Sequence, residues 1–476
     1  MRMVNGLNYS EFCRIWDNMD WKEINYHVRK LQQRIAAAAY DGDWKRVRRL
    51  QKLVFVSWDC RAFAVHRVTC RRAVRTAGLD GLFWYSDFSR FQALEELKNY
   101  HDYKPMPFKR IYIPKDHDRS KKRPLSVPVI YDRAMQALYL IACDPVVECT
   151  AGEHDYGFRM YRSSQDVIRD IVSHFGFESG RIYFLKSDVK QCFDHLSHDW
   201  ILQHAPMNRK LLKRVLKCGY CWNGKFHETN EGVPQGGVLS PCMTSLCLNG
   251  FERVMYPKFG DDACMVRFVD DFLFSGTSPD VLEGVKNELI AFLAERGLSI
   301  SEDKTIIGSI YDGVDYIGWH IQRDENGLQL SPTQMSIDEL THRLEVVFHE
   351  GRKYTARKLI RKLNGMIRGW SNYHGYLCAP HYLADIDNML QDMVWEWALQ
   401  KHPRRKPKWI YLHHWKYQPE TKRREFSSDD VWLLHFTDIK VKMKRTLDLS
   451  KNPYLDLEYF RRMDDVVTEP LNKNRD

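Results

Sequence analysis

Apolar residues recur at helical spacing in two stretches near the N-terminus. The first stripe comprises Val28, Leu31, Ile35 and Ala38, and the second comprises Trp44, Val47, Leu50 and Val54. Side chains three or four positions apart share one face of a helix, so each stripe predicts an amphipathic helix. Basic side chains flank the second stripe and fit either a solvated helix face or an arm that contacts phosphates: Lys45, Arg46, Arg48, Arg49 and Lys52. Residues 1–100 are therefore predicted to form a helical N-terminal extension.

Short runs of β-forming residues replace this pattern from Arg110 onward. The runs are Arg110–Ile113, Ile182–Leu185, Met265–Phe268, Phe272–Ser275 and Tyr316–Ile321. Helical stretches lie between them, and Val281–Arg296 has amphipathic spacing. This mixture predicts an α+β domain over residues 101–328, built on a largely antiparallel sheet.

Helical periodicity returns after Pro332. It predicts helices in Ile337–Phe348, Ala356–Met366 and Leu383–Leu399, and hence a helical domain over residues 329–398. Lys401–Trp409 follows with five basic residues and two prolines, which is typical of a basic linker or surface loop. Residues 399–476 are predicted to be a basic C-terminal region that binds nucleic acid.

The composition of the 476-residue chain restricts the class of protein. The chain is 44% hydrophobic, which allows a sizeable core and excludes disorder, and its net charge of +10 suits a polyanionic partner. The longest apolar stretch, Ala137–Cys143, is too short to span a bilayer, and residues 1–20 lack a signal-peptide core. Twelve scattered cysteines predict reduced thiols and a cytoplasmic location. Cys218 and Cys221 have metal-ligand spacing, but no second pair follows them, so no structural zinc site is predicted.

The candidate chemistry begins with two adjacent aspartates. Apolar β runs flank Asp270 and Asp271, with no glycine or proline between the runs. A tight hairpin would hold both carboxylates against a buried sheet, which is unfavourable unless a cation compensates. Mg²⁺ is the natural candidate, because it binds a few carboxylates and keeps positions for water and phosphates. The pair Asp261 and Asp262 follows Gly260 and is interpreted as an ordinary turn.

A third carboxylate follows the strand expected at Ile182–Leu185. Asp188 lies near the end of this strand, where it can join the hairpin pair from an adjacent strand. Together these carboxylates could bind two metal ions ~3.5–4 Å apart, the spacing used for in-line displacement at phosphorus. Asp194 competes for the role, but it precedes a helical segment and is interpreted as a turn or cap residue.

A glycine-rich turn, Pro234–Gly237, lies between the two acidic segments in the sequence. Its paired glycines allow the backbone to approach a ligand closely, and a helix is expected to begin near Ser240. Alone such a turn is a weak signal, but its position between the acidic segments makes it a strong one.

Together these motifs resemble those of the reverse transcriptases, in particular the proteins encoded by group II introns and their close relatives. Asp188 with Phe193 is similar to the first acidic motif of that family, Pro234–Gly237 to its template- and nucleotide-facing motif, and Phe268–Asp271 to its metal-binding box. The resemblance implies a right-hand polymerase with fingers, a palm and a helical thumb or maturase domain. It implies two Mg²⁺ ions, with Mn²⁺ as a substitute. The implied metal ligands are Asp188, Val189, Asp270 and Asp271.

The resemblance also implies contacts with substrates. Phe193 would lie under the deoxyribose, and Gln235 near the templating base pair. Tyr316–Trp319 resembles the primer-supporting hairpin, and Gly369–His374 the thumb signature. The implied nucleotide contacts are Lys115, Arg123, Phe193, Gln235 and Lys304. The implied nucleic-acid contacts are Arg159, Gly236, Gly237, Gly318, Trp319, Lys401, Arg404 and Arg405, although Arg159 also fits a structural role.

The sequence departs from the family pattern in two places. The metal box usually begins with Tyr-Ala, whereas Phe268 and Val269 stand here, which removes a polar phenol and adds bulk. The chain also ends at Asp476 without the Cys- and His-containing nuclease module of many intron-encoded relatives. Both differences favour a host-serving role, such as phage defence or DNA repair, with an intron-encoded maturase as the alternative.

The predicted function is therefore an RNA-directed DNA polymerase. It would extend a DNA or RNA primer with dNTPs on an RNA template, either an intron or a non-coding RNA, or on DNA. The competing hypotheses are an RNA-binding splicing cofactor with an incidental polymerase site and a non-catalytic scaffold. The three carboxylates argue against the scaffold, since a binding module has no need of them. No membrane partner is expected, and the oligomeric state is left open.

Overall fold

The computed structural model describes residues 9–69, 76–114, 122–176, 179–441 and 445–467. Contacts within the chain divide it into two compact units. The first unit comprises Met1–Ser163, Leu185–Ile307 and Leu447–Asp476, and the second comprises Ser164–Phe184 and Gly308–Thr446. Each unit thus combines segments that are distant in the sequence.

Helices form the N-terminal part of the first unit, as the apolar stripes predicted. They are α1 (Tyr9–Asp17), α2 (Trp21–Tyr40), α3 (Trp44–Val56), α4 (Trp58–Thr69) and α5 (Asp87–Glu96). α2, α3 and α4 pack against the largely buried α6 (Ile130–Glu148). The carboxylates of Asp20 and Asp43 cap α2 and α3 by accepting backbone N–H bonds. Trp44 departs from the predicted buried stripe, because it lies in the first turn of α3 and is 50% exposed.

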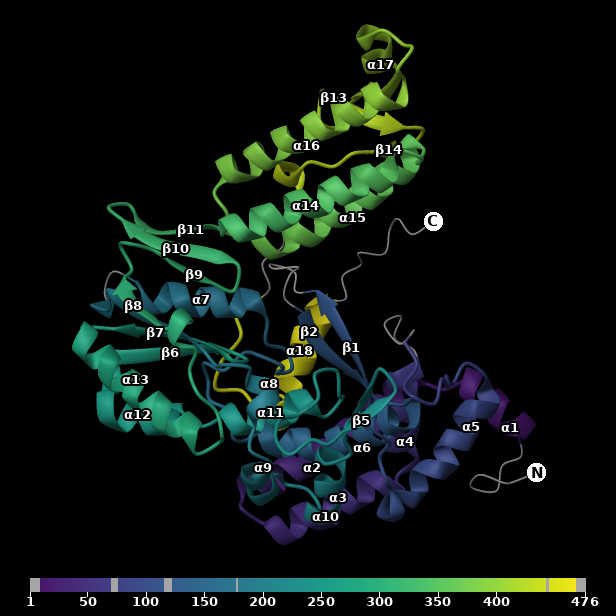
Figure 1. Cartoon of the computed structure of the whole chain (residues 1–476), viewed down its shortest axis with the longest axis vertical. Helices are drawn as coiled ribbons and strands as arrows, with labels where there is room; N and C mark the ends of the chain where they lie inside the picture. Colours follow the sequence, from purple (N-terminus) through teal and green to yellow (C-terminus); the bar gives the residue numbers. More distant parts are fainter. Residues whose placement is uncertain (1–8, 70–75, 115–121, 177–178, 442–444, 468–476) are drawn as a thin grey trace. The chain divides into compact units, whose positions relative to one another are not determined.

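A four-stranded sheet of the first unit has the order β2-β1-β4-β5. Its strands are β1 (Phe108–Pro114), β2 (Lys122–Val127), β4 (Tyr220–Trp222) and β5 (Lys225–His227). β1 pairs antiparallel with β2, its neighbour in Figure 1, and parallel with β4. Three short helices precede β4 in the sequence: α8 (Cys192–His195), α9 (His198–His204) and α10 (Arg209–Leu216).

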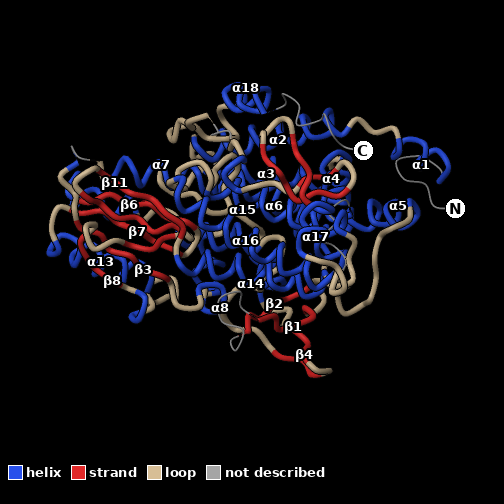
Figure 2. The backbone as a smooth tube through the Cα atoms, turned by 90° about the horizontal axis from the view of Figure 1, so that it is seen from above, coloured by secondary structure: helices blue, strands red, loops and turns tan. Residues whose placement is uncertain are grey.

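The other four-stranded sheet carries the acidic segments and has the order β6-β7-β3-β8 (Figure 2). Its strands are β3 (Tyr183–Asp188), β6 (Ala263–Phe268), β7 (Asp271–Gly276) and β8 (Ile306–Ser309). β6 and β7 form an antiparallel hairpin, and α12 (Glu252–Phe259) and α13 (Pro279–Ala294) pack against it. The Phe251 ring contacts those of Phe272, Phe274 and Phe292 edge to face, at centroid distances of 5.3–6.4 Å. The hairpin is thus anchored by an aromatic core, and α11 (Ser240–Leu248) begins where the sequence predicted a helix.

The second unit contains two small sheets and a helical part. The first sheet has the order β11-β10-β9, with β9 (Val314–Tyr316), β10 (Trp319–Asp324) and β11 (Gly327–Pro332). The helices are α7 (Ser164–His174), α14 (Gln334–Gly351), α15 (Ala356–His374), α16 (Pro380–Lys401) and α17 (Pro407–His414). α14 packs against α15 and α16, as Figure 1 shows. Among the described residues, no helix combines the length and the apolar character that a membrane crossing requires.

The structure corrects two predictions for this unit. The strand predicted at Tyr316–Ile321 is two strands, because Ile317 and Gly318 have φ angles of 41° and 82° and turn the chain between them. The loop predicted at Lys401–Trp409 ends early, because Pro407 begins α17, a position that proline favours. A further sheet follows that the sequence did not indicate, formed by β12 (Trp415–Gln418), β13 (Arg423–Ser428) and β14 (Val431–Trp432).

The C-terminal segment returns to the first unit, so the region predicted at 399–476 is divided between the two units. Tyr454 is 1% exposed, and its hydroxyl group donates to the Asp144 carboxylate of α6. The Phe460 ring, in α18 (Leu457–Val467), lies 4.5 Å from the Tyr161 ring. These aromatic side chains bury large surfaces against the first unit, a long-range contact that local composition does not reveal.

Candidate active site

Three carboxylates converge at one end of the β6-β7-β3-β8 sheet. Asp188 is the last residue of β3, and Asp270 and Asp271 occupy the turn and the first position of β7. β3 and β7 are neighbours in the sheet, and the Val189 N–H donates to the Asp270 carbonyl at 3.3 Å. The sheet therefore brings Asp188 beside the hairpin pair, as the sequence led us to expect.

Burial and mutual repulsion act on these carboxylates. The pKa of Asp271 is raised to about 7, first by burial and then by the charges of Asp270 and Asp188. The pKa of Asp270 is also raised, again mainly by burial. Like charges in a desolvated cluster stay ionised only when cations compensate them. The electrostatics therefore favour cation binding at this end of the sheet.

Two lysines lie at the carboxylate cluster. The Lys304 ammonium group donates to the Asp188 carboxylate, and this hydrogen bond raises the pKa of Lys304. Lys186 lies two residues before Asp188 on β3, and its charge opposes the burial and repulsion that raise the pKa of Asp271. Lys304 was predicted as a site residue, whereas Lys186 was missed. Strand alternation could have revealed it, since residues two apart share a face of the sheet.

The donor set fits a divalent cation. Three aspartates supply the hard oxygen ligands that Mg²⁺ prefers, while leaving positions for water and phosphate. The Lys304 side chain is 65% exposed, so little packing opposes its displacement from Asp188 by a cation. Ligation by the Val189 carbonyl stays a prediction.

The glycine-rich turn is held by contacts with two other elements. The Ser126 N–H of β2 donates to the Gln235 carbonyl at 2.7 Å. Gly236 has a φ of 103°, and a Cβ there would lie 2.6 Å from the Ser126 carbonyl oxygen, so the turn requires glycine. The amide of Gln136, 1% exposed in α6, accepts the Val238 N–H at 2.8 Å. Gln136 thus ties the end of the turn to α6.

A cavity of about 370 Å³ lies beside Phe193, and Pro234 also lines it. Phe193 lies in α8, and its ring meets that of Phe158 edge to face at 6.3 Å. Asp194, the alternative acidic candidate, lies within α8 and lines the same cavity. The arrangement is compatible with the predicted contact between Phe193 and a nucleotide sugar, which stays a prediction.

Two residues were predicted to contact the triphosphate, and one of them lies among the described residues. Arg123 is exposed on β2, and its charge opposes the burial that raises the pKa of Asp270. Its contact with a nucleotide stays a prediction. Lys115 lies outside the described residues.

Arg159, predicted to contact nucleic acid, is engaged inside the first unit. Its guanidinium group pairs with the Glu148 carboxylate at 2.6 Å and donates to the carbonyls of Gly152 and Asp155. The side chain is 8% exposed. Since all these donors face the protein interior, the geometry favours the structural interpretation of Arg159 over a template contact.

The hairpin turn between β9 and β10 is supported by the predicted thumb signature. Trp319 is fully buried, and its ring centroid lies 4.9 Å from that of His374. The Tyr373 hydroxyl group donates to the Ile317 carbonyl. The Trp319 ring therefore serves as core, and a nucleic-acid contact at this residue stays a prediction. A contact through the Gly318 backbone stays a prediction.

His374 should make the second unit sensitive to acid. Burial lowers its pKa to about 3, and its Nδ1 atom has no hydrogen-bond partner among the described residues. The unfolded chain binds a proton at this histidine below a pH of about 6.5, whereas the folded chain resists it. The stability contributed by neutral His374 is therefore complete above that pH and is lost as the pH falls toward 3.

We expect hydrogen exchange in α15 to accelerate between pH 7 and pH 5, after correction for intrinsic rates. The acceleration should be smaller in His374→Phe, which stays uncharged. His349→Phe, at an exposed position of α14, is the matched control and should retain the wild-type slope. Identical slopes in wild type and His374→Phe would contradict the prediction.

The basic residues after α16 lie at a surface. Arg404 and Arg405 are exposed between α16 and α17, and the Arg405 guanidinium lies 4.6 Å from the Trp409 ring centroid. Lys401, the last residue of α16, donates to the Arg352 carbonyl at 3.4 Å. Cations beside an exposed aromatic ring suit nucleic-acid binding, which stays a prediction for all three.

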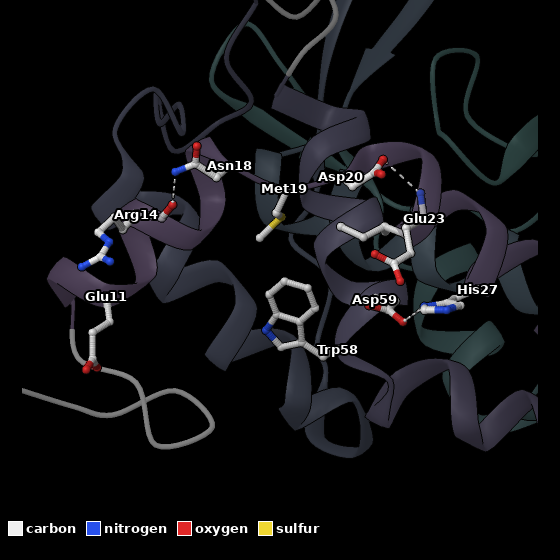
Figure 3. A pocket seen from close by; sticks show the side chains of 10 residues that line it. Glu11, Arg14, Asn18, Met19, Asp20, Glu23, His27, Trp58 and Asp59 are labelled. Atoms are coloured by element: carbon white, nitrogen blue, oxygen red, sulfur yellow. Dashed lines mark hydrogen bonds and ion pairs between the residues drawn. The ribbon is translucent and has the colours of Figure 1, made fainter.

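A larger cavity, of about 860 Å³, lies among the N-terminal helices (Figure 3). Figure 3 shows the His27 ring directed at the Asp59 carboxylate, with which it pairs at 3.0 Å, and Asp20 capping α2. The cavity contains none of the predicted site residues. It offers no chemistry comparable to the carboxylate cluster.

Three segments of the chain match known protein families. Residues 113–321 match reverse transcriptase (RNA-dependent DNA polymerase), which includes the carboxylates and the glycine-rich turn. Residues 16–97 match the N-terminal domain of reverse transcriptase, and residues 337–415 match the maturase-specific domain of group II introns. The chain belongs to the reverse transcriptases. The third match makes it one of the group II intron type.

Three curated relatives agree with this assignment. Protein YkfC of Escherichia coli is 28% identical to this reverse transcriptase over 344 residues, which cover 62% of this chain and 88% of YkfC. Maturase-like protein 1 of Euglena gracilis is 27% identical over 373 residues, 76% of this chain and 78% of its own. Group II intron-encoded protein LtrA of Lactococcus lactis is 32% identical over 157 residues, 32% of this chain and 26% of its own.

The family confirms the predicted class of fold and chemistry. The reverse transcriptase is an RNA-directed DNA polymerase with a right-hand polymerase fold, and hence a nucleotidyltransferase. It binds an RNA template and nucleotide substrates, and it depends on a divalent metal ion, generally Mg²⁺. The β6-β7-β3-β8 sheet lies within the segment that matches reverse transcriptase, whereas the bounds of the fingers, palm and thumb stay predictions.

Proposed function

We propose that this reverse transcriptase extends primer 3′ ends by two-metal-ion nucleotidyl transfer at Asp188, Asp270 and Asp271. The observation that carries the proposal is the convergence of the three carboxylates at neighbouring strand ends. There the charges of Asp270 and Asp188 help to raise the pKa of Asp271. Two bound divalent ions would activate the primer hydroxyl group and stabilise the charge that develops on the α-phosphate. Mg²⁺ is the proposed ion, and Mn²⁺ the proposed substitute.

The chain's other residues would bind and orient the substrates. Lys304 and Arg123 are cations at the carboxylate cluster and are proposed to take the triphosphate as it arrives. Phe193 would exclude a 2′-hydroxyl group from the cavity beside it, and Gln235 would align the templating base pair. The Ser126 contact fixes the Gln235 backbone and so supports its role.

Metal removal tests this proposal. Extension of a primed RNA template by the full chain should stop in excess EDTA and resume when Mg²⁺ or Mn²⁺ is added beyond the chelator. The expected loss is complete, because the carboxylates alone cannot activate a hydroxyl group. Continued synthesis in EDTA would overturn the two-metal assignment.

We also propose a host-serving role in the cytoplasm, such as phage defence or DNA repair, with a non-coding RNA as template and a DNA or RNA primer. Phe268 and Val269 support it, since they replace the usual Tyr-Ala of the metal box. The described cysteines, which are all free thiols, support a reducing compartment.

An intron-encoded maturase active in splicing is the second candidate. The match of residues 337–415 to the group II maturase-specific domain favours it. Sequencing the RNA that copurifies with the chain separates the two roles. Intron RNA would support the maturase, whereas another RNA species would support the host-serving role.

A further inference from the structure

The turn that carries the metal-binding aspartates has a strained backbone. Val269, directly before Asp270, has a φ of 61°. Left-handed φ angles are uncommon for residues with a Cβ, and a β-branched side chain makes them less favourable still. Such a conformation persists only where surrounding contacts enforce it.

A buried arginine contacts this strained residue. Arg267 of β6 is 4% exposed, and its Nη1 donates to the Val269 carbonyl at 2.9 Å. Its Nε donates to the Asp155 carboxylate at 2.6 Å, and its Nη2 donates to the Asn249 side-chain oxygen at 2.8 Å. A planar guanidinium with three occupied donors has a fixed orientation, so the Val269 carbonyl is held in a defined position.

The residues that hold Arg267 are themselves fixed by other elements. Asn249, at the end of α11, donates to the Val147 carbonyl at 3.2 Å and to Thr150 at 3.0 Å. The Asp155 carboxylate accepts the Gly152 N–H at 2.9 Å. Arg267 thus links the turn to α6, to α11 and to the loop after α6.

We infer that Arg267 is a positioning residue for catalysis: it holds the strained Val269 turn so that Asp270 and Asp271 present their carboxylates in the geometry that binds metal. The inference rests on the proposed role of these aspartates. Arg267 itself bonds to the turn backbone, Asp155 and Asn249, so it acts through the Val269 carbonyl. Without this bond, the turn relaxes toward an unstrained conformation and the two carboxylates move.

A rescue experiment tests the inference. Arg267→Met removes the donors while keeping a long side chain, and we expect it to lower kcat for primer extension about tenfold or more, with a smaller change in KM for dNTP. Mn²⁺ binding, followed by the EPR signal of the free ion, should weaken by a similar factor. Val269→Gly removes the strain, since glycine adopts this φ freely, and should restore part of both losses in the Arg267→Met background.

Arg61→Met is the matched control. Arg61 is 2% exposed and also donates to a carbonyl, that of Leu94, but it lies in the N-terminal helices. This variant should destabilise the fold without weakening Mn²⁺ binding, and Val269→Gly should not compensate its effect. A loss in Arg267→Met that Val269→Gly leaves unchanged would overturn the positioning role and make Arg267 a structural residue.

Arg267→Met leaves the Asp155 carboxylate buried without its partner, which destabilises the fold. A second variant therefore keeps the inference testable if Arg267→Met does not fold. Arg267→Met with Asp155→Asn removes both charges and should fold, yet still lose kcat and Mn²⁺ affinity. If this variant also fails to fold, Arg267 serves the core and the inference is wrong. The wild-type chain tests the proposed function separately: absence of primer extension by wild type, or continued synthesis in EDTA, would refute that function rather than the role of Arg267.

Discussion

Primer extension should fall by at least ~10³-fold when Asp270 and Asp271 are both replaced by alanine, since loss of even one group that stabilises transition-state charge lowers kcat by about 10²–10³-fold. Burial raises the pKa of both carboxylates, so their ionised forms do not stabilise the folded chain. In EDTA, the variant should therefore melt no lower than wild type. Activity and melting temperature, measured on the same preparation, separate catalytic loss from unfolding.

The chain offers a matched control for this variant. Asp261 and Asp262 are also adjacent aspartates, but they form an exposed 3₁₀ turn that precedes β6. Replacing both with alanine should leave primer extension within about twofold of wild type, because surface changes away from a site have small effects. Undiminished synthesis by the Asp270/Asp271 variant would contradict the assignment of the active site.

Gly157→Ala should give the second-largest loss, on the order of 10²-fold in kcat, because a misplacement of about 1 Å at a catalytic group can have that effect. An added Cβ at Gly157 would lie 2.3 Å from the Val269 backbone nitrogen and 2.3 Å from its Cγ2 atom. Neither the backbone of the turn nor the β-branched side chain can yield without moving Asp270. Steady-state primer extension and Mn²⁺ binding measure the loss.

Two further variants make this prediction specific. Gly365→Ala, in α15, places its Cβ in open space and should preserve activity while stabilising the helix by up to ~1 kcal/mol. Gly157→Ala combined with Val269→Gly removes the Cγ2 clash but not the clash with the backbone nitrogen, so only partial recovery is expected. Full activity in Gly157→Ala would show that the turn tolerates displacement.

The amino-acid sequence by itself determined the chemistry of the site. Metal-assisted phosphoryl transfer requires clustered carboxylates, and Asp188 and the Asp270–Asp271 pair are recognisable because each follows a buried β run. Helices and strands of the N-terminal extension and palm were also predictable, since apolar periodicity reflects burial of one face. Where periodicity failed, as for Trp44 and for the hairpin turn at Ile317, the end of a helix or a positive φ intervened.

Only the tertiary structure decided which residues support that chemistry. Arg267 and Asp155 are 112 residues apart in the sequence, and Gln136 and Val238 are 102 apart, so no local pattern reveals either contact. The same holds for Arg159 and Trp319, whose residue types suit nucleic acid but whose side chains are buried. A sequence motif contains the residue types that the reaction requires. Burial and hydrogen-bond partners depend instead on which distant segments the fold brings together.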